Sequence, residues 1–138
     1  AVLSDASIKE NIDYVEALGC YVLVGGKSKV NAADFFSSDR FRNFVDRARE
    51  EFDVILIDTP PVLAVPDARI IGQVSDVILY VVLWDKTHKK QVAEGTRLFR
   101  AVNLHITGTV LSQISLKGMK RYGHEATYGS YAGSYYEP

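Results

Sequence analysis

Residues 54–61 read Val-Ile-Leu-Ile-Asp-Thr-Pro-Pro, and this stretch decides which fold the sequence predicts. Its first four residues form an apolar run without polar alternation, which is typical of a strand covered on both faces in a parallel sheet. Pro60 and Pro61 lack the backbone N–H group that a sheet requires, so the strand must end before them. Asp58 is therefore expected at the carboxyl end of a buried strand.

Other apolar runs continue this pattern along the chain. They predict further strands at residues 20–24, 77–83 and 106–111. Between the strands, apolar residues recur at spacings of three and four, which predicts helices at residues 38–52, 67–74 and 86–102. The first helix follows Ser37 and Ser38, which are suited to capping. Strands that alternate with helices predict βαβ units and hence a three-layer α/β domain with a parallel sheet.

The composition is that of one globular domain. The 138 residues are 47% hydrophobic and 24% charged, and the formal net charge is -1. A chain of this length can bury a single core. Binding along a nucleic acid needs clustered Lys and Arg side chains that replace counterions at the phosphates. We therefore expect no nucleic-acid partner.

The single cysteine, Cys20, cannot form an intrachain disulfide, which favours a cytoplasmic setting. Because Cys20 lies in an apolar run, it is expected to be an inert thiol in the core. No stretch reaches the roughly 20 apolar residues of a membrane-spanning helix, and the N-terminus does not read as a signal peptide. A first residue other than Met suggests a fragment, although processing would look the same.

Asp58 is the strongest candidate for chemistry. The carboxyl ends of the strands are where open α/β sheets bind ligands. A carboxylate at that edge can hold a Mg²⁺-bound water beside nucleotide phosphates, which is the Walker B role. The alternative is that Asp58 only accepts hydrogen bonds from loop amides before a turn.

A second motif, Gly26-Lys27-Ser28, imitates the end of a phosphate-binding loop. The first glycine of that motif would fall at Tyr21, so the match is incomplete.

The last part of the chain differs from the rest. Beyond Lys117 large aliphatic side chains vanish and tyrosines alternate with glycine and serine, so we expect a mobile tail at residues 117–138 after an α/β part at residues 1–116. Phenol oxygens on such a segment could accept phosphate, or the tail could be a sticky terminus that packs on a partner. The candidate acceptors are Tyr122, Tyr128, Tyr131, Tyr135 and Tyr136.

Several motifs in combination resemble one family. Residues 58–63 read Asp-Thr-Pro-Pro-Val-Leu, and they are followed by Asp67-Ala68-Arg69 and Ser75-Asp76-Val77. Upstream, Gly25-Gly26 precedes the segment 31–41, and the tyrosine cluster ends the chain. This order resembles the C-terminal half of the kinase domain of bacterial tyrosine kinases of the exopolysaccharide and capsule type. The resemblance implies a P-loop NTPase-like fold of the deviant Walker class.

The resemblance also implies roles for particular residues. Asp58, Thr59 and Pro60 would contact ATP, with Asp58 catalytic and holding Mg²⁺ through water. The tail tyrosines would accept the γ-phosphoryl group from an adjacent subunit of a ring-like homo-oligomer. A membrane chain-length regulator, in the same or a partner chain, would place the kinase at the cytoplasmic face of the bacterial inner membrane.

Departures from the family pattern limit these expectations. The phosphate-binding loop of the family is missing, so this chain alone is not expected to transfer phosphoryl groups. Ala32 stands where the family has proline, and Ser112 stands where relatives commonly place an asparagine near adenine. Two alternatives stay open: a non-catalytic regulatory module phosphorylated by a separate kinase, and a partitioning-type deviant Walker ATPase. The tyrosine tail argues against the second.

The remaining polar candidates have weaker patterns. Asp67 is expected to cap a helix rather than act as a base. Asp76 is expected to be structural at the start of a strand. Trp84 and Asp85 follow a strand and either line the nucleotide crevice or pack at its rim. The three histidines are widely separated, so we expect no zinc site.

Overall fold

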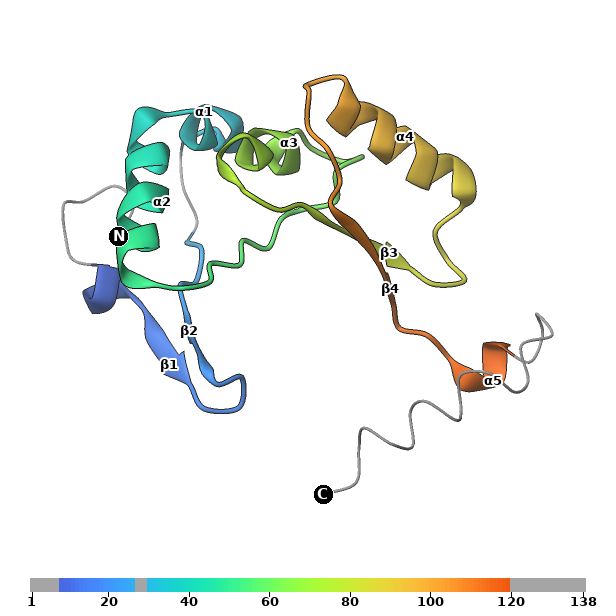
Figure 1. The fold of residues 1–138 in the computed structure, drawn as a ribbon, viewed down its shortest axis with the longest axis horizontal. Coiled ribbons are helices and arrows are strands. Elements are labelled where there is room, and N and C mark those ends of the chain that lie inside the picture. The colour runs from blue at the N-terminus through green and yellow to red at the C-terminus, as the bar shows by residue number, and fades with distance from the viewer. Residues whose placement is uncertain (1–7, 27–29, 120–138) are drawn as a thin grey trace.

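The computed structural model describes residues 8–26 and 30–119 of the chain (Figure 1). The N-terminal elements are the 3₁₀ helix η1 (Ile8–Asn11), the strands β1 (Asp13–Val15) and β2 (Cys20–Val22), and the helices α1 (Ala32–Phe36) and α2 (Asp39–Glu51). After a long extended connection follow α3 (Asp67–Ile71), η2 (Gly72–Val74), β3 (Leu79–Leu83), α4 (Lys89–Arg100), β4 (Gly108–Ser112) and α5 (Leu116–Met119).

The C-terminal part is a βαβ unit, as predicted. β3 pairs with β4 in parallel, with Leu79 opposite Gly108 and Leu83 opposite Ser112. α4 connects the two strands and lies above them in Figure 1. Its N-cap residue is His88, whose N–H donates to the Gln91 side chain at 2.9 Å. The helix therefore starts three residues later than the predicted range of 86–102.

Gly95 fixes how closely α4 approaches β3. A Cβ atom at this buried position would collide with the ring and hydroxyl of Tyr80, and it would lie 3.2 Å from a Val62 methyl group. The Tyr80 ring also packs edge-on against Phe99, with ring centroids 6.2 Å apart. Burial raises the pKa of the Tyr80 hydroxyl. The glycine inside the predicted helix is thus a packing feature.

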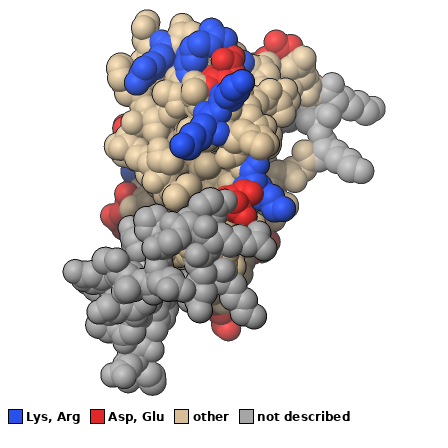
Figure 2. Space-filling view, turned by 90° about the vertical axis from the view of Figure 1, so that its right-hand side faces the viewer, with Lys and Arg blue, Asp and Glu red and all other residues tan. Residues whose placement is uncertain are grey.

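The outer surface of α4 is charged. Lys89, Lys90 and Arg100 are exposed, and Glu94 pairs with Arg97 at 2.7 Å. On the face shown in Figure 2, lysine and arginine side chains gather at the upper end, with acidic side chains among them. Positive charge on this face is therefore local and partly compensated.

α2 confirms the predicted helix at residues 38–52. Ser38 is its N-cap, and the Phe41 N–H donates to the Ser38 hydroxyl at 3.3 Å. Phe41 and Val45 are buried together with Ile71 of α3 in one apolar cluster. The 3.6-residue period therefore placed the correct face of α2 in the core.

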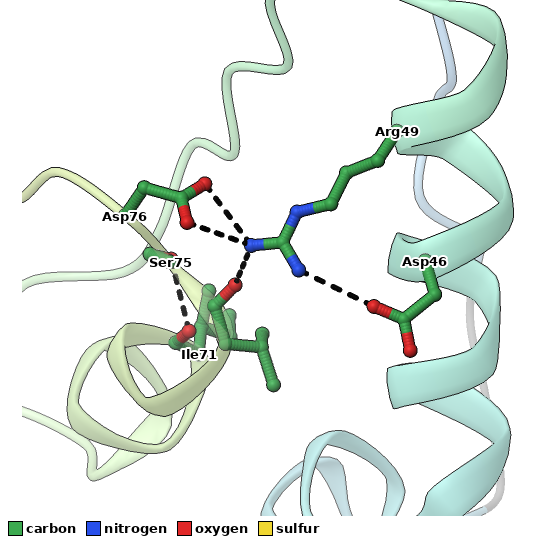
Figure 3. A network of polar contacts seen from close by, with 6 residues as sticks. Asp46, Arg49, Ile71, Ser75 and Asp76 are labelled. Atoms are coloured by element: carbon green, nitrogen blue, oxygen red, sulfur yellow. Dashed lines mark hydrogen bonds and ion pairs between the residues drawn. The ribbon is translucent and has the colours of Figure 1, made fainter.

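Arg49 of α2 ties this core to the segment before β3 (Figure 3). Its Nη2 donates to the carbonyl of Val74 at 2.8 Å and to both oxygens of Asp76, at 3.0 and 3.2 Å. Its Nη1 donates to Asp46 at 3.2 Å. Asp76 is therefore structural, as expected.

The predicted strand at residues 54–57 is extended but pairs with no strand among the described residues. Val54 and Leu56 are 83% and 82% exposed, whereas Ile57 packs against the cluster of α2 and α3. The prediction that this run is buried on both faces is therefore wrong. The reason is that a strand needs a neighbour for its backbone groups, and no described segment supplies one.

β3 shows the same one-sided burial. Tyr80 and Val82 point toward the helix side, while Leu79 and Val81 on the other face are 57% and 60% exposed. Val110 of β4, which lies opposite Val81 and shares its face, is exposed as well. In the described part of the chain, the helices cover one face of the strands, and the opposite face is bare.

The predicted strand at residues 20–24 belongs to a different structure. β2 pairs with β1 in an antiparallel hairpin, and Gly19 closes the turn at a φ of 63°. Cys20 is exposed, so the prediction of a core thiol is wrong. The short hairpin buries little because no described layer covers it. Neither β1 nor α1 was predicted, although Asn31 caps α1 through a 2.9 Å bond from the Ala33 N–H.

Candidate functional site

The candidate site lies along the carboxyl ends of the parallel strands. β3 runs into Trp84 and Asp85, and β4 runs into Gln113. Asp85 and Gln113 both have a φ of 57°, in the left-handed region that residues other than glycine seldom adopt. Such conformations cluster at functional sites, because they aim side chains and backbone groups in directions that a regular strand cannot.

A cavity of about 450 Å³ opens at this edge. Trp84 and Asp85 line it from the end of β3, and Thr87 and Lys89 line it from the start of α4. Its inner wall is apolar, with Val82 and Leu111 from the two strands. Of the two alternatives left open by the sequence, the structure places both Trp84 and Asp85 in the lining of a cavity, while the binding of a nucleotide there stays a prediction. The contributions of Thr87 and Lys89 were missed, although Thr87 stands between β3 and α4 and Lys89 is the first residue of α4, where such sites form.

Asp58 stands at the end of the extended segment and is exposed. It lines neither this cavity nor a second one near α3. Within the described residues its carboxylate forms no hydrogen bond or ion pair, so the loop-amide bonds of the alternative interpretation are not present there. Thr59 is half-buried and Pro60 is exposed. The carboxylate is therefore free to accept a ligand.

The other polar candidates have structural surroundings. Asp67 does not cap α3 as predicted: Pro66 is the N-cap residue, and Asp67 is the buried first residue of the helix. Ser112 ends β4 and donates from Oγ to the carbonyl of Val82 at 3.5 Å. The five tail tyrosines lie outside the described residues.

The start of the tail contacts the site. A Cβ atom at Gly118 of α5 would collide with the Trp84 ring, so the helix backbone lies directly against this indole. α5 crosses the predicted boundary between residues 116 and 117. The chain therefore leaves the βαβ unit at the same edge that carries the cavity.

The described residues fit a Mg²⁺–nucleotide complex in part. An exposed carboxylate without a partner, such as Asp58, is the oxygen ligand that Mg²⁺ and its bound waters accept. No described segment forms the glycine-rich cradle of backbone N–H groups that holds phosphates. No group of three His, Cys, Asp or Glu side chains in residues 8–26 and 30–119 is placed to hold a metal ion by itself. Over the same ranges, every helix is too short or too polar to cross a membrane.

Comparisons with known proteins give relatives of one kind, although no family model matches the chain. The tyrosine-protein kinase ptk of Acinetobacter johnsonii is 35% identical over 108 residues, which are 78% of this chain and 15% of the relative. The tyrosine-protein kinase YwqD of Bacillus subtilis is 28% identical over 91% of this chain and 53% of the relative. The crystal structure of the VpsO kinase domain superposes with a TM-score of 0.75 at 25% identity, covering 83% of this chain and 56% of that domain. The chain thus spans about half of that solved structure and about half of YwqD, and a smaller share of the longer ptk.

Proposed function

Because this chain is homologous to bacterial tyrosine kinases and has the fold of their kinase domain, we propose that it forms half of an ATP-dependent tyrosine kinase site. Asp58 would hold Mg²⁺ through water, with Thr59 and Pro60 beside the nucleotide. The magnesium ion would neutralise charge on the transferring phosphoryl group. The observation that carries this proposal is an exposed carboxylate with no partner among the described residues, at the end of an apolar extended segment.

The exposed apolar side chains of the strands support the proposal that a second polypeptide binds there and completes the kinase domain. Val54, Leu56, Leu79 and Val81 are large apolar side chains left in water, and exposed apolar surface of this kind marks an interaction site. The segment 54–57 pairs with no strand in residues 8–26 and 30–119, so an added strand can complete its hydrogen bonds. We propose that the occupant is a polypeptide that carries a phosphate-binding loop, since the chain matches about half of a solved kinase domain.

The tail supplies the acceptors in this proposal. Tyr122, Tyr128, Tyr131, Tyr135 and Tyr136 follow α5, whose backbone lies against Trp84 at the carboxyl edge. Acceptors attached at that edge can reach the site of a neighbouring copy in a ring-like homo-oligomer. We also propose, from the resemblance, control of polysaccharide chain length with a membrane regulator at the cytoplasmic face of the inner membrane.

The test is labelling of the tail. We expect this chain, combined with a loop-bearing kinase half, ATP and Mg²⁺, to be labelled in peptides from Lys120 onward. Asp58→Asn should abolish the labelling. Asp53→Asn, an exposed aspartate five residues earlier, should leave it unchanged and is the matched control. Label confined to residues 8–119 would contradict the proposal.

A second function is favoured by one feature of the sequence. No stretch of the 138 residues has the spacing of a phosphate-binding loop, because Tyr21 stands where its first glycine belongs. The chain would then be a regulatory module whose tail is phosphorylated by a separate kinase. In that case a complete kinase of the family labels the tail equally well in the wild-type and Asp58→Asn chains, which distinguishes the two functions.

A further inference from the structure

A second cavity, of about 240 Å³, lies where α1, α2, α3 and η2 meet. None of the residues that line it belongs to the carboxyl ends of β3 or β4, so it is separate from the candidate kinase site. Its cationic groups are Arg42 from the first turn of α2 and Arg69 from α3. No aspartate or glutamate lines it.

The guanidinium group of Arg69 includes a buried N–H donor that lacks a hydrogen-bond acceptor in the described part of the chain. Its Nε is buried and forms no hydrogen bond with any residue that the structure describes. Over residues 8–26 and 30–119, neither Arg69 nor Arg42 forms an ion pair, in contrast to Arg49 and Arg97, which each contact a carboxylate. A buried N–H group without an acceptor is destabilising, because it has lost its water. An anion in the cavity would supply that acceptor.

Most of the remaining wall is apolar, with Phe36, Pro66, Ile70, Val74 and Val102. Of its two polar residues, Ser37 already donates from Oγ to the Ala33 carbonyl at 2.7 Å. The Gln73 side chain already donates to the Val102 carbonyl at 3.2 Å. A small hydrated anion would gain nothing from such walls, whereas an anion carried on a ring would bury its apolar part there. The planar fork of arginine matches phosphate oxygens in particular.

We propose that this cavity binds a phosphotyrosine side chain. The ring would lie against Phe36 and Ile70, and the phosphate would accept hydrogen bonds from Arg42 and Arg69. The tyrosine-rich segment 122–136 of this chain is the source we assign, and that assignment rests on the proposed function of the tail. Phosphorylation would then create a ligand that the same protein recognises.

The experiment is titration of the full chain with a synthetic peptide of residues 126–134 phosphorylated at Tyr131. Calorimetry and amide NMR shifts at Gly72, Gln73 and Val102 report binding. We expect Arg69→Gln to weaken the affinity by about tenfold or more, because it removes charge-assisted hydrogen bonds to the phosphate. Arg42→Gln should also weaken it, and Arg40→Gln, an exposed neighbour that does not line the cavity, should leave it unchanged.

Because the peptide is phosphorylated chemically, the result does not depend on kinase activity. Absence of binding, or binding that Arg69→Gln and Arg42→Gln leave unchanged, would overturn the proposal. Inorganic phosphate that binds as tightly as the peptide would overturn the role of the ring. A tail that is never labelled by any kinase would defeat the proposed function while leaving this peptide measurement intact.

Discussion

The helices α2 and α3 differ from the extended segment 54–57 and β3 in how completely their apolar side chains are buried. α2 and α3 bury Phe41, Val45 and Ile71 against one another, and Arg49 links α2 to the segment before β3. By contrast, the extended segment 54–57 and the outer face of β3 leave large apolar side chains in water. In sequence the strand side is the more apolar of the two, because residues 54–57 are all aliphatic whereas α2 carries many charged residues.

This difference shows that hydrophobic content does not decide burial. A helix forms its own backbone hydrogen bonds and needs cover on one stripe only, which a second helix can supply. A central strand needs a neighbour on each edge and a layer on each face. Within the described residues α2 and α3 cover each other's apolar faces. β3 and β4 are covered on one face only, and the segment 54–57 pairs with no strand.

The sharpest test compares one side chain from each region. Phe41→Ala should lower the free energy of unfolding by about 3 kcal/mol, because it empties a buried ring site. Leu56→Ala should change it by less than about 0.5 kcal/mol, since that side chain is exposed. Urea denaturation followed by circular dichroism measures both. Equal costs would mean that the segment 54–57 is buried in solution.

The contact between α4 and β3 gives the next largest effect. Gly95→Ala should destabilise by about 1–3 kcal/mol through collision with Tyr80, although alanine favours the helix. Tyr80→Phe removes the hydroxyl at the point of collision, so Gly95→Ala should cost less in that background. A double-mutant cycle measures the difference. Additive costs would contradict this packing.

The Arg49 network should contribute less. Arg49→Met is expected to cost no more than about 1 kcal/mol, because Asp76 is well exposed and water screens the pair. The cost should shrink as salt is added, which thermal melts at several ionic strengths would reveal. Arg40→Met on the same helix, whose side chain is exposed, should not change the melting temperature. A larger cost would show that the link, rather than the apolar cluster, holds the segment before β3.

The smallest effect concerns the surface of α4. The hydrogen bond from Arg97 lowers the pKa of the Glu94 carboxyl below its ordinary value. This pair therefore stabilises the fold above the ordinary glutamate pKa, and the contribution is lost as the pH falls through the lowered value. Arg97→Gln should raise the Glu94 pKa, which carboxyl carbon NMR would follow during an acid titration. An unchanged pKa would mean that the pair does not persist in solution.

Local pattern predicted much of the fold. The spacing of Phe41, Val45 and Ala48 identified α2 and its buried face, and Ser38 identified its start. The runs at 77–83 and 106–111, with a helix between them, identified the parallel pair of β3 and β4. At the candidate site, the position of Trp84 and Asp85 after a strand left lining of a crevice and packing at its rim both open, and the structure places them at a cavity.

Other features could not follow from local pattern. The run 20–24 read as a buried parallel strand, but its partner is a preceding segment that turns back at Gly19. Asp67 is of a residue type that often caps helices, but Pro66 takes the N-cap position of α3. The roles of Asp58 and of the tail tyrosines remain predictions.

The sequence by itself determined that α2 and α4 are helical and that the apolar runs are extended, because hydrogen bonds within a turn and side-chain periods of 2 and 3.6 residues are local properties. Only the tertiary structure decided which strands pair, which apolar residues stay in water, and that Arg49 binds Asp76 while Arg42 and Arg69 share a cavity. Those outcomes depend on groups many residues apart along the chain. Their meeting is set by packing of whole elements, which no short stretch encodes.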